Sequence, residues 1–368
     1  QETAKLKSII ASLSAILAGL SAIGIGNGLL NIAIPTKAHQ FGFSSLNIGL
    51  LTALYYGGFL CGCFYTPKLV NRSGHIRSFA VYAAVLCVAA LSFGYNQNFI
   101  FWLTLRFISG FCIAGIYMIT ESWVNEITDN KNRGRIISIY RIIDLGSLML
   151  GQILLGHFVL GKNFMFMFAA TLINIGLIPV ALTSKTGPKP LEDVSINIKR
   201  VFRNSQIGVV TSGLIGVSNS AFWALGPVLA LSLNFNFMET GYFMAAAVLG
   251  GIFSQYPIGI LADKVDREKL LTITAFICAL IGYYAFRVTT REASAFSMIF
   301  ISFLWGSFSM SLYSLTIAIA NDRSPSKYFL EVSGGLLVVF SIGAIVGPIL
   351  AGFCINIFGP KGLFSFIA

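Results

Sequence analysis

The feature that most constrains this chain is a series of eleven long apolar stretches, each near the length of a bilayer-spanning helix. A helix needs about 20 mostly apolar residues to cross the hydrocarbon of a membrane. Lipid offers no hydrogen-bond partners, so a spanning backbone must satisfy its own polar groups, as a helix does. We therefore predict an all-α integral membrane protein with spans at residues 8–34, 47–67, 78–95, 99–122, 136–159, 164–183, 207–231, 239–262, 270–288, 295–319 and 332–357.

The two ends of the sequence add two expectations. A twelfth apolar stretch begins near Gly362 and the sequence ends at Ala368, so we expect a helix there that is too short to cross a bilayer. The first stretch follows Lys5 and Lys7 as a secretory signal would. It continues for about 25 residues without a small-residue cleavage site, which favours a retained first helix.

Composition agrees with lipid as the solvent of this chain. Charged residues make up 11% of the sequence, whereas soluble proteins carry about 25%. The net charge of +11 comes from short basic clusters between apolar runs. These clusters lack the interleaved aromatic residues of single-strand binders, so we expect no nucleic-acid partner. All six cysteines lie within apolar runs, which favours buried thiols over disulfides.

The basic residues also predict the orientation of the helices. If the N-terminus is cytoplasmic, eighteen of the 25 Lys and Arg residues fall in inside segments and five, Lys37 among them, fall in outside loops. Arg106 and Arg141 fall within helices. This bias follows the positive-inside rule and predicts an even number of helices with both termini in the cytoplasm.

One polar segment divides the chain near its middle. Residues 184–206 are basic and contain prolines, with six apolar runs before them and about six after. We predict an N-terminal six-helix bundle at 1–183, a cytoplasmic linker at 184–206 and a C-terminal bundle at 207–368.

Two loops at equivalent places in the halves are related in sequence. The second reads Gly259-Ile-Leu-Ala-Asp263-Lys-Val-Asp-Arg267, and the first reads PKLVNRSGHIR from residue 67, with Asn71, Arg72 and Gly74 at the comparable positions. The matching residues keep a constant offset of 192, about the length of one half. A duplicated architecture requires such an offset.

These loops resemble the G-x-L-a-D-r-x-G-r-[RK] loop of the major facilitator superfamily. The second copy has Asp266 in place of the second glycine, and the first has Pro67 and Asn71 in place of Gly and Asp. The Leu103-x2-Arg106-Phe-x2-Gly110 stretch and the Glu126-x6-Arg133 spacing also match that superfamily. The segments ESWVNEITDNKNRGRIISIY, GQILLG, QYPIGILADK and LYSLTIAIAND are similar to its YcaD-type branch.

The resemblance implies two six-helix bundles related by pseudo-two-fold symmetry, with the first, fourth, seventh and tenth helices lining a central path. It also implies a cavity-facing arginine at Arg106 for substrate anions or proton coupling, whereas a structural arginine bonded to a neighbouring helix is the alternative. Polar residues on the lining and flanking helices are candidates for substrate binding, although each could instead bond a neighbouring helix. These are Asn27, Asn31, Gln152, Asn219, Trp223, Gln255, Trp305 and Tyr313.

Ionisable residues at membrane depth are costly, so they are candidates for function. Arg141 and Asp144 lie one turn apart, so they share a helix face. They form either a self-neutralising ion pair, or a carboxylate ligand and a proton-titrating acid. Glu121 is a third candidate for proton coupling, unless it reaches the membrane interface.

The loop charges suggest a cytoplasmic gate. We expect Arg72, Glu126 and Arg133 to form one ion-pair cluster, and Asp263 and Arg267 another, with Asn71, Gly74 and Gly259 shaping the loops. Such clusters could release as the bundles rock. Glycine pairs four residues apart predict close helix packing instead of function. The pairs are Gly24 and Gly28, Gly58 and Gly62, and Gly343 and Gly347.

These features favour a secondary transporter of a small, carboxylated or otherwise anionic solute, proton-coupled, monomeric and resident in a bacterial inner membrane. A multidrug or metabolite efflux antiporter is the alternative, although Gln152 stands where such exporters commonly carry proline. A lipid-modifying membrane enzyme and a channel are alternatives of other classes. The sequence has no nucleotide-binding G-x4-G-K-[ST] motif and no His-pair metal motif, so we expect no cofactor and no metal.

Overall fold

The computed structural model describes residues 2–127, 133–158, 163–183, 198–289, 294–325 and 329–368, and all regular structure in these ranges is helical. Eleven of the described helices are long and apolar enough to cross a membrane, as predicted. The elements are α1 (Glu2–Gln40), α2 (Ser45–Ser73), α3 (His75–Ser92), α4 (Phe99–Ile127), α5 (Arg133–Leu154), the 3-10 turn η1 (Leu155–His157), α6 (Phe164–Ala181), α7 (Ile198–Asn204), α8 (Gln206–Ser232), α9 (Phe237–Lys264), α10 (Arg267–Thr289), α11 (Ala295–Asp322), α12 (Phe329–Phe358) and α13 (Gly362–Ile367).

Helix ends follow local capping chemistry. Asn236 and Glu239 form a reciprocal capping box at the start of α9, with both nitrogen–oxygen distances at 2.9 Å. Ser205 caps α8 by accepting from the backbone of Gly208 at 3.1 Å. Between α2 and α3 the chain turns at Gly74, which has a φ of 80°. That conformation is left-handed and favours glycine.

The first helix is longer than predicted, which changes the environment of Lys37. Because α1 continues to Gln40, Lys37 lies within the helix and not in an outside loop. Its side chain is 1% exposed, and its Nζ lies 5.9 Å from the centroid of the Phe41 ring. The assignment of Lys37 to a loop was therefore wrong.

The predicted glycine contacts are confirmed in each half. A methyl group on Gly28 would lie 2.4 Å from the carbonyl oxygen of Leu148, and one on Gly58 would lie 1.9 Å from that of Phe107. On α12, Gly343 meets the backbone of Gly213 in the same way, at 2.2 Å. Only glycine permits these backbones to approach so closely.

The chain packs as two compact units. One unit holds residues 1–30, 57–152 and 158–193; the other holds residues 31–56, 153–157 and 194–368. Within the second unit, a methyl group on Gly49 would lie 2.2 Å from the carbonyl oxygen of Pro348, and Gly352 packs on Leu46. The bundle boundaries at 183 and 207 stay a prediction about the sequence duplication.

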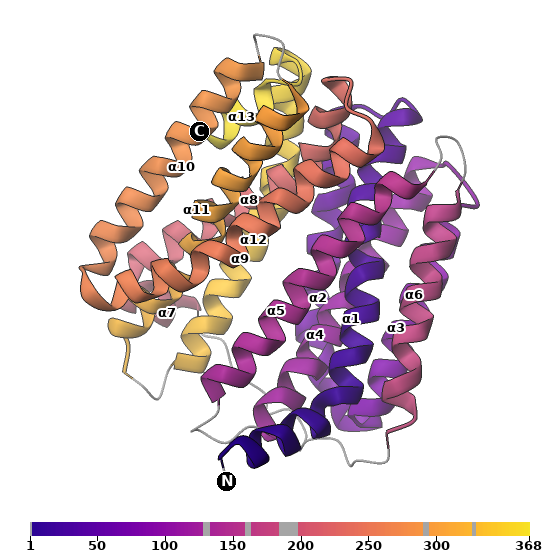
Figure 1. The fold of residues 1–368 in the computed structure, drawn as a ribbon, viewed down its shortest axis with the longest axis vertical. Helices are drawn as coiled ribbons and strands as arrows, with labels where there is room; N and C mark the ends of the chain where they lie inside the picture. Colours follow the sequence, from indigo (N-terminus) through magenta and orange to yellow (C-terminus); the bar gives the residue numbers. More distant parts are fainter. Residues whose placement is uncertain (1, 128–132, 159–162, 184–197, 290–293, 326–328) are drawn as a thin grey trace. The chain divides into compact units, whose positions relative to one another are not determined.

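Neighbouring helices can be followed within each unit. In the first unit α3 packs beside α6, and in the second α10 packs beside α11 (Figure 1). Most of the predicted linker lies outside the described residues, but its end forms α7. Arg200 of α7 pairs with Glu331 of α12 at 3.0 Å, and Val201 packs on Leu336. The linker therefore ends on a helix fixed to α12.

Candidate functional site

A polar cluster joins α4 and α5 within the first unit. The Tyr117 hydroxyl donates to Oδ1 of Asp144 at 2.9 Å, and Nη1 of Arg141 lies 3.7 Å from Oδ2 of the same carboxylate. Asp144 is 6% exposed. A buried carboxylate is stabilised by a donor and a nearby cation, so these two partners stabilise its charged form.

The same cluster holds a second acid. The Tyr140 hydroxyl donates to Oε1 of Glu121 at 3.2 Å, and the guanidinium carbon of Arg141 lies 5.9 Å from the centroid of the Tyr140 ring. Tyr140 is buried, whereas Glu121 is exposed and the Arg141 side chain is 55% exposed. We refer to Tyr117, Glu121, Tyr140, Arg141 and Asp144 as the α4–α5 cluster.

The depth of this cluster indicates what its exposed groups face. Glu121 lies four residues before the end of the span Phe99–Asn125, and Asp144 lies eight residues after the start of the span Ile136–His157. At 1.5 Å per residue these positions are about 6 Å and about 12 Å inside the spans. Charged groups at such depth avoid hydrocarbon. The exposed faces of Glu121 and Arg141 are therefore better matched to water than to hydrocarbon.

Arg106 does not belong to this cluster. It is 3% exposed and lies on α4, eleven residues before Tyr117. That separation is about 16 Å along the helix. Arg106 thus lies nearer the opposite end of α4 from Glu121, and its role in binding or coupling stays a prediction.

In the second unit, the candidates of α8 and α11 bond a serine or pack against aromatic rings. Ser309 of α11 donates to the side-chain oxygen of Asn219 on α8. Trp305 is 1% exposed and stacks on Phe222, with ring centroids 4.1 Å apart. Trp223 makes an edge contact with the Phe222 ring and is half-buried. Trp305 therefore packs inside the helices in this conformation, while Asn219 and Trp223 keep partial exposure.

The remaining predicted binding residues are scattered. Asn27 is buried in the first unit, and Asn31, one turn along α1, is half-buried in the second unit. Gln152 is buried, and its Oε1 has no hydrogen-bond partner among the described residues. Gln255 and Tyr313 are half-buried, and the Tyr313 ring lies 5.1 Å from that of Phe340.

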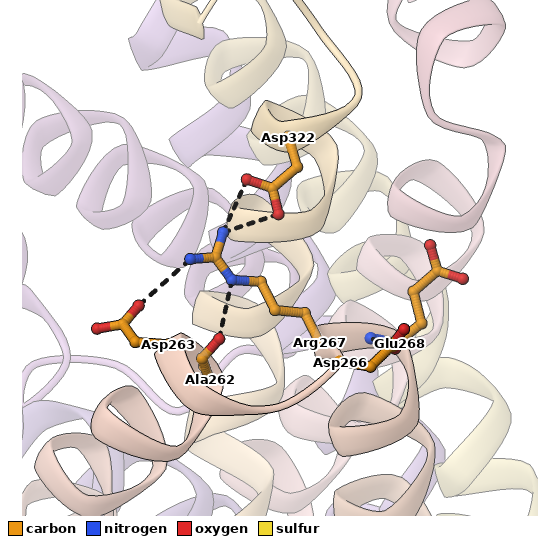
Figure 2. Close-up of polar contacts among 6 residues, drawn as sticks. All are labelled: Ala262, Asp263, Asp266, Arg267, Glu268 and Asp322. Carbon is orange, nitrogen blue, oxygen red and sulfur yellow. Dashed lines mark hydrogen bonds and ion pairs between the residues drawn. The ribbon is translucent and has the colours of Figure 1, made fainter.

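The second-copy loop residues form an ion-pair network with the end of α11, which Figure 2 shows. Nη2 of Arg267 lies 3.3 Å from Oδ1 of Asp263, and Nη1 lies 2.8 Å from both oxygens of Asp322. The Nε of Arg267 donates to the carbonyl of Ala262 at 3.2 Å. One guanidinium thus links α9, α10 and α11.

A second pair stands beside this one. Arg323, directly after α11, bonds Glu268 of α10. Both pairs line a hollow of about 440 Å³. The Asp266 side chain caps α10 by accepting from the backbone nitrogens of Lys269 and Glu268, each at 2.9 Å. These bonds, the one from Lys269 foremost, hold the pKa of Asp266 below its usual value.

The first-copy loop can be described only in part. Asn71 and Arg72 are exposed, and Gly74 supplies the turn to α3. The side chains of Glu126 and Arg133 lie outside the described residues, so the predicted cluster of Arg72 with them stays a prediction. Gly259 lies in mid-helix, and a methyl group there would meet no atom within 4 Å.

Sequence reasoning missed several partners. Tyr117 and Tyr140 donate hydrogen bonds to the two acids of the α4–α5 cluster. Asp322 and Arg323, at the end of α11, form ion pairs with Arg267 and Glu268. Tyr117 precedes Glu121 by four residues, which places both on one helix face, so that spacing was a usable signal. Asp322 and Arg323 end an apolar run in the same half as Asp263 and Arg267. Opposite charges at the ends of neighbouring spans are a signal from which ion pairs between helices could be predicted.

The sequence is similar to known membrane transporters over most of its length. The model of the Major Facilitator Superfamily matches residues 16–282 and residues 208–368. The chain belongs to the major facilitator superfamily. It is 25% identical to the MFS-type transporter YcaD of Salmonella typhi over 344 residues, which cover 92% of this chain and 88% of that protein. YcaD of Escherichia fergusonii matches to the same extent.

Solved structures of other transporters share this superfamily fold. The nucleoside transporter NupG superposes with a TM-score of 0.81 at 10% identity, over 98% of this chain and 96% of that one. An inward-facing, occupied bacterial homolog of the human lysosomal transporter Spinster gives 0.78 at 14%, over 95% and 82%. The D-xylose–proton symporter gives 0.75 at 12%, over 97% and 96%. Identities this low show the fold alone.

The family membership confirms the predicted fold class, the superfamily and its YcaD-type branch. This multi-pass membrane protein is a transporter that binds small molecules, and it is not an enzyme. The lipid-modifying enzyme is therefore excluded as an alternative.

Proposed function

We propose that this transporter couples inward proton movement to uptake of a small solute bearing a carboxylate, by alternating access. The observation that carries the proposal is the ion pair of buried Asp144 with exposed Arg141 in the α4–α5 cluster. We place the protein as a monomer in a bacterial inner membrane with both termini cytoplasmic, on the strength of its charge bias and its similarity to YcaD.

The ion pair suggests how the two events are linked. When a proton binds the Asp144 carboxylate, its attraction for Arg141 is lost. The guanidinium, already mostly exposed, is then free to take the carboxylate of a solute through its planar donors. Departure of the solute restores the pair and releases the proton. Proton and solute are thus favoured together, which is the requirement for symport.

The network around Arg267 is proposed as a cytoplasmic latch of the second unit. Three helix ends are linked through one guanidinium, and the pairs are partly exposed to solvent. Exposed pairs of this kind contribute about 1 kcal/mol or less each. They are weak enough to break when the helices move, and together they bias one arrangement.

The test is transport by purified protein in sealed liposomes under an imposed pH gradient, with a pH-sensitive dye inside. A panel of organic acids, amino acids, sugars and nucleosides is added outside. Symport predicts acidification of the lumen on addition of a carboxylated solute, and its loss in Asp144→Asn. Alkalinisation of the lumen by a solute would instead support the alternative, an efflux antiporter.

A further inference from the structure

The α4–α5 cluster contains one more charge than the proposed coupling uses. Within the part of the chain that the structure describes, the Glu121 carboxylate accepts one hydrogen bond, from the Tyr140 hydroxyl to Oε1. Among the described residues no basic nitrogen lies within ion-pair distance of it. Arg141, the nearest cation to act on its charge, is paired with Asp144 instead. Glu121 is therefore an exposed carboxylate within a membrane span, without an ion-pair partner among the residues that the structure describes.

Tyr140 contacts both Glu121 and Arg141. Its hydroxyl bonds Glu121, and its ring faces the Arg141 guanidinium. The buried phenol therefore contacts two opposite charges, both on exposed side chains. Neither charge neutralises the other directly.

The charge balance of the cluster selects among solutes. With Asp144 protonated, one negative charge (Glu121) and one positive charge (Arg141) remain. A simple anion on Arg141 would lie close to the Glu121 carboxylate and be repelled. A simple cation on Glu121 would lie close to the freed Arg141 guanidinium and be repelled by it. A molecule with an ammonium and a carboxylate places an opposite charge on each of the two residues.

We infer that the solute is a zwitterion, whose ammonium group binds the Glu121 carboxylate while its carboxylate binds the Arg141 guanidinium. The inference rests on the proposed proton-coupled uptake, and it narrows the solute class from carboxylated compounds in general. Amino acids, with the amine on the α carbon or further along the chain, are the simplest members of this class.

Matched triplets of solutes test the inference in the same liposome assay. Each triplet contains an amino acid, its C-terminal amide (a cation) and its N-acetyl derivative (an anion), for amines at the α, β, γ and ε positions. We expect at least one zwitterion to drive proton entry, and both of its charge-deleted partners to be weaker by about tenfold or more, because each leaves one charged group of the site without its partner.

Glu121→Gln supplies the decisive variant. It should weaken the response to the zwitterion and strengthen the response to the N-acetyl anion, because the repelling charge is gone. Glu239→Gln, which changes a carboxylate at the start of α9, should leave the ranking unchanged. Responses to the anion or the amide equal to those of the zwitterion would overturn the inference, as would silence from every triplet.

The result separates this inference from the proposed function. If sugars, nucleosides or plain organic acids drive proton entry in an Asp144-dependent way while the triplets do not, proton coupling stands and the zwitterion is rejected. If no solute moves protons, both fail.

Discussion

The Nη1 atom of Arg267 lies 2.8 Å from both carboxylate oxygens of Asp322, closer than the 3.3 Å between its Nη2 atom and Asp263. Asp263 is four residues away, near the end of α9, whereas Asp322 is 55 residues away on α11. The contact remote in sequence is therefore the tighter of the two. Both contacts join separate helices: Asp263 ties α9 to α10, and Asp322 ties α11 to α10.

The first prediction compares these two acids. Asp322→Asn should lower the thermal stability of the detergent-purified protein more than Asp263→Asn, because Asp322 makes the shorter contacts with Arg267; each exposed pair contributes about 1 kcal/mol or less. Both should change transport rate while leaving membrane insertion intact. Equal melting shifts in the two variants, together with wild-type transport, would count against a latch centred on Arg267.

The second prediction concerns the donor to Asp144. Tyr117→Phe removes the hydroxyl that stabilises the charged carboxylate, a contribution of about 1.5–3 kcal/mol for a bond to a charged group. The neutral form gains by comparison, so the pH profile of transport should move toward higher pH. The profile is measured as initial uptake rate against external pH. Tyr140→Phe, which removes the donor to Glu121, is the matched control and should move the profile less. A Tyr117→Phe profile that overlays the wild type would remove Asp144 from the coupling step.

The third prediction compares the stability effects of substituting Gly74 and Gly259, the two glycines of the repeated motif. Gly74→Ala forces a side chain into a positive-φ conformation (φ 80°, ψ 164°) that is nearly restricted to glycine, at about 1–3 kcal/mol, and should lower the melting temperature. Gly259→Ala should be neutral or stabilising, because the position is helical and a methyl group there meets nothing. Paired thermal denaturation measurements decide this. A larger loss of stability in Gly259→Ala than in Gly74→Ala would contradict the conclusion that the backbone conformation requires glycine only at position 74.

The fourth prediction is a pH dependence at the α10 cap. The folded-state pKa of Asp266 is lowered by backbone donors, so its contribution is present above the unfolded-state pKa and is lost as pH falls through the folded one. Asp266→Ala should therefore destabilise the protein at neutral pH and make less difference in acid. Asp266→Asn keeps a capping oxygen and should be milder at neutral pH. The melting temperature of each variant is measured between neutral and acidic pH. A destabilisation by Asp266→Ala that grows in acid would contradict the expected loss of the Asp266 contribution as pH falls.

The two related loops also show why the motif departs from its pattern. Gly74 and Asp266 occupy equivalent places, 192 residues apart. The first has a positive φ, whereas Asp266 does not and caps α10 instead. A glycine is required only in the first copy, so the second was free to place a capping acid there.

The sequence by itself determined the class, the number of long apolar helices, the duplicated loops and the close glycine contacts. Each of these depends on local or one-dimensional properties: the length of an apolar run, the placement of bases in loops, and the size of a side chain. Lipid makes them decisive, because a backbone in hydrocarbon must be helical.

Only the tertiary structure decided which polar groups meet. The helices are apolar on nearly every side, since the lipid face and the packed face are both apolar, so hydrophobic periodicity gives little sign of how each helix is rotated. That rotation puts Tyr117 on Asp144, puts Asp322 on Arg267 and buries Trp305 against Phe222. Pairings across helices depend on rotation and register together, which no single stretch of sequence contains.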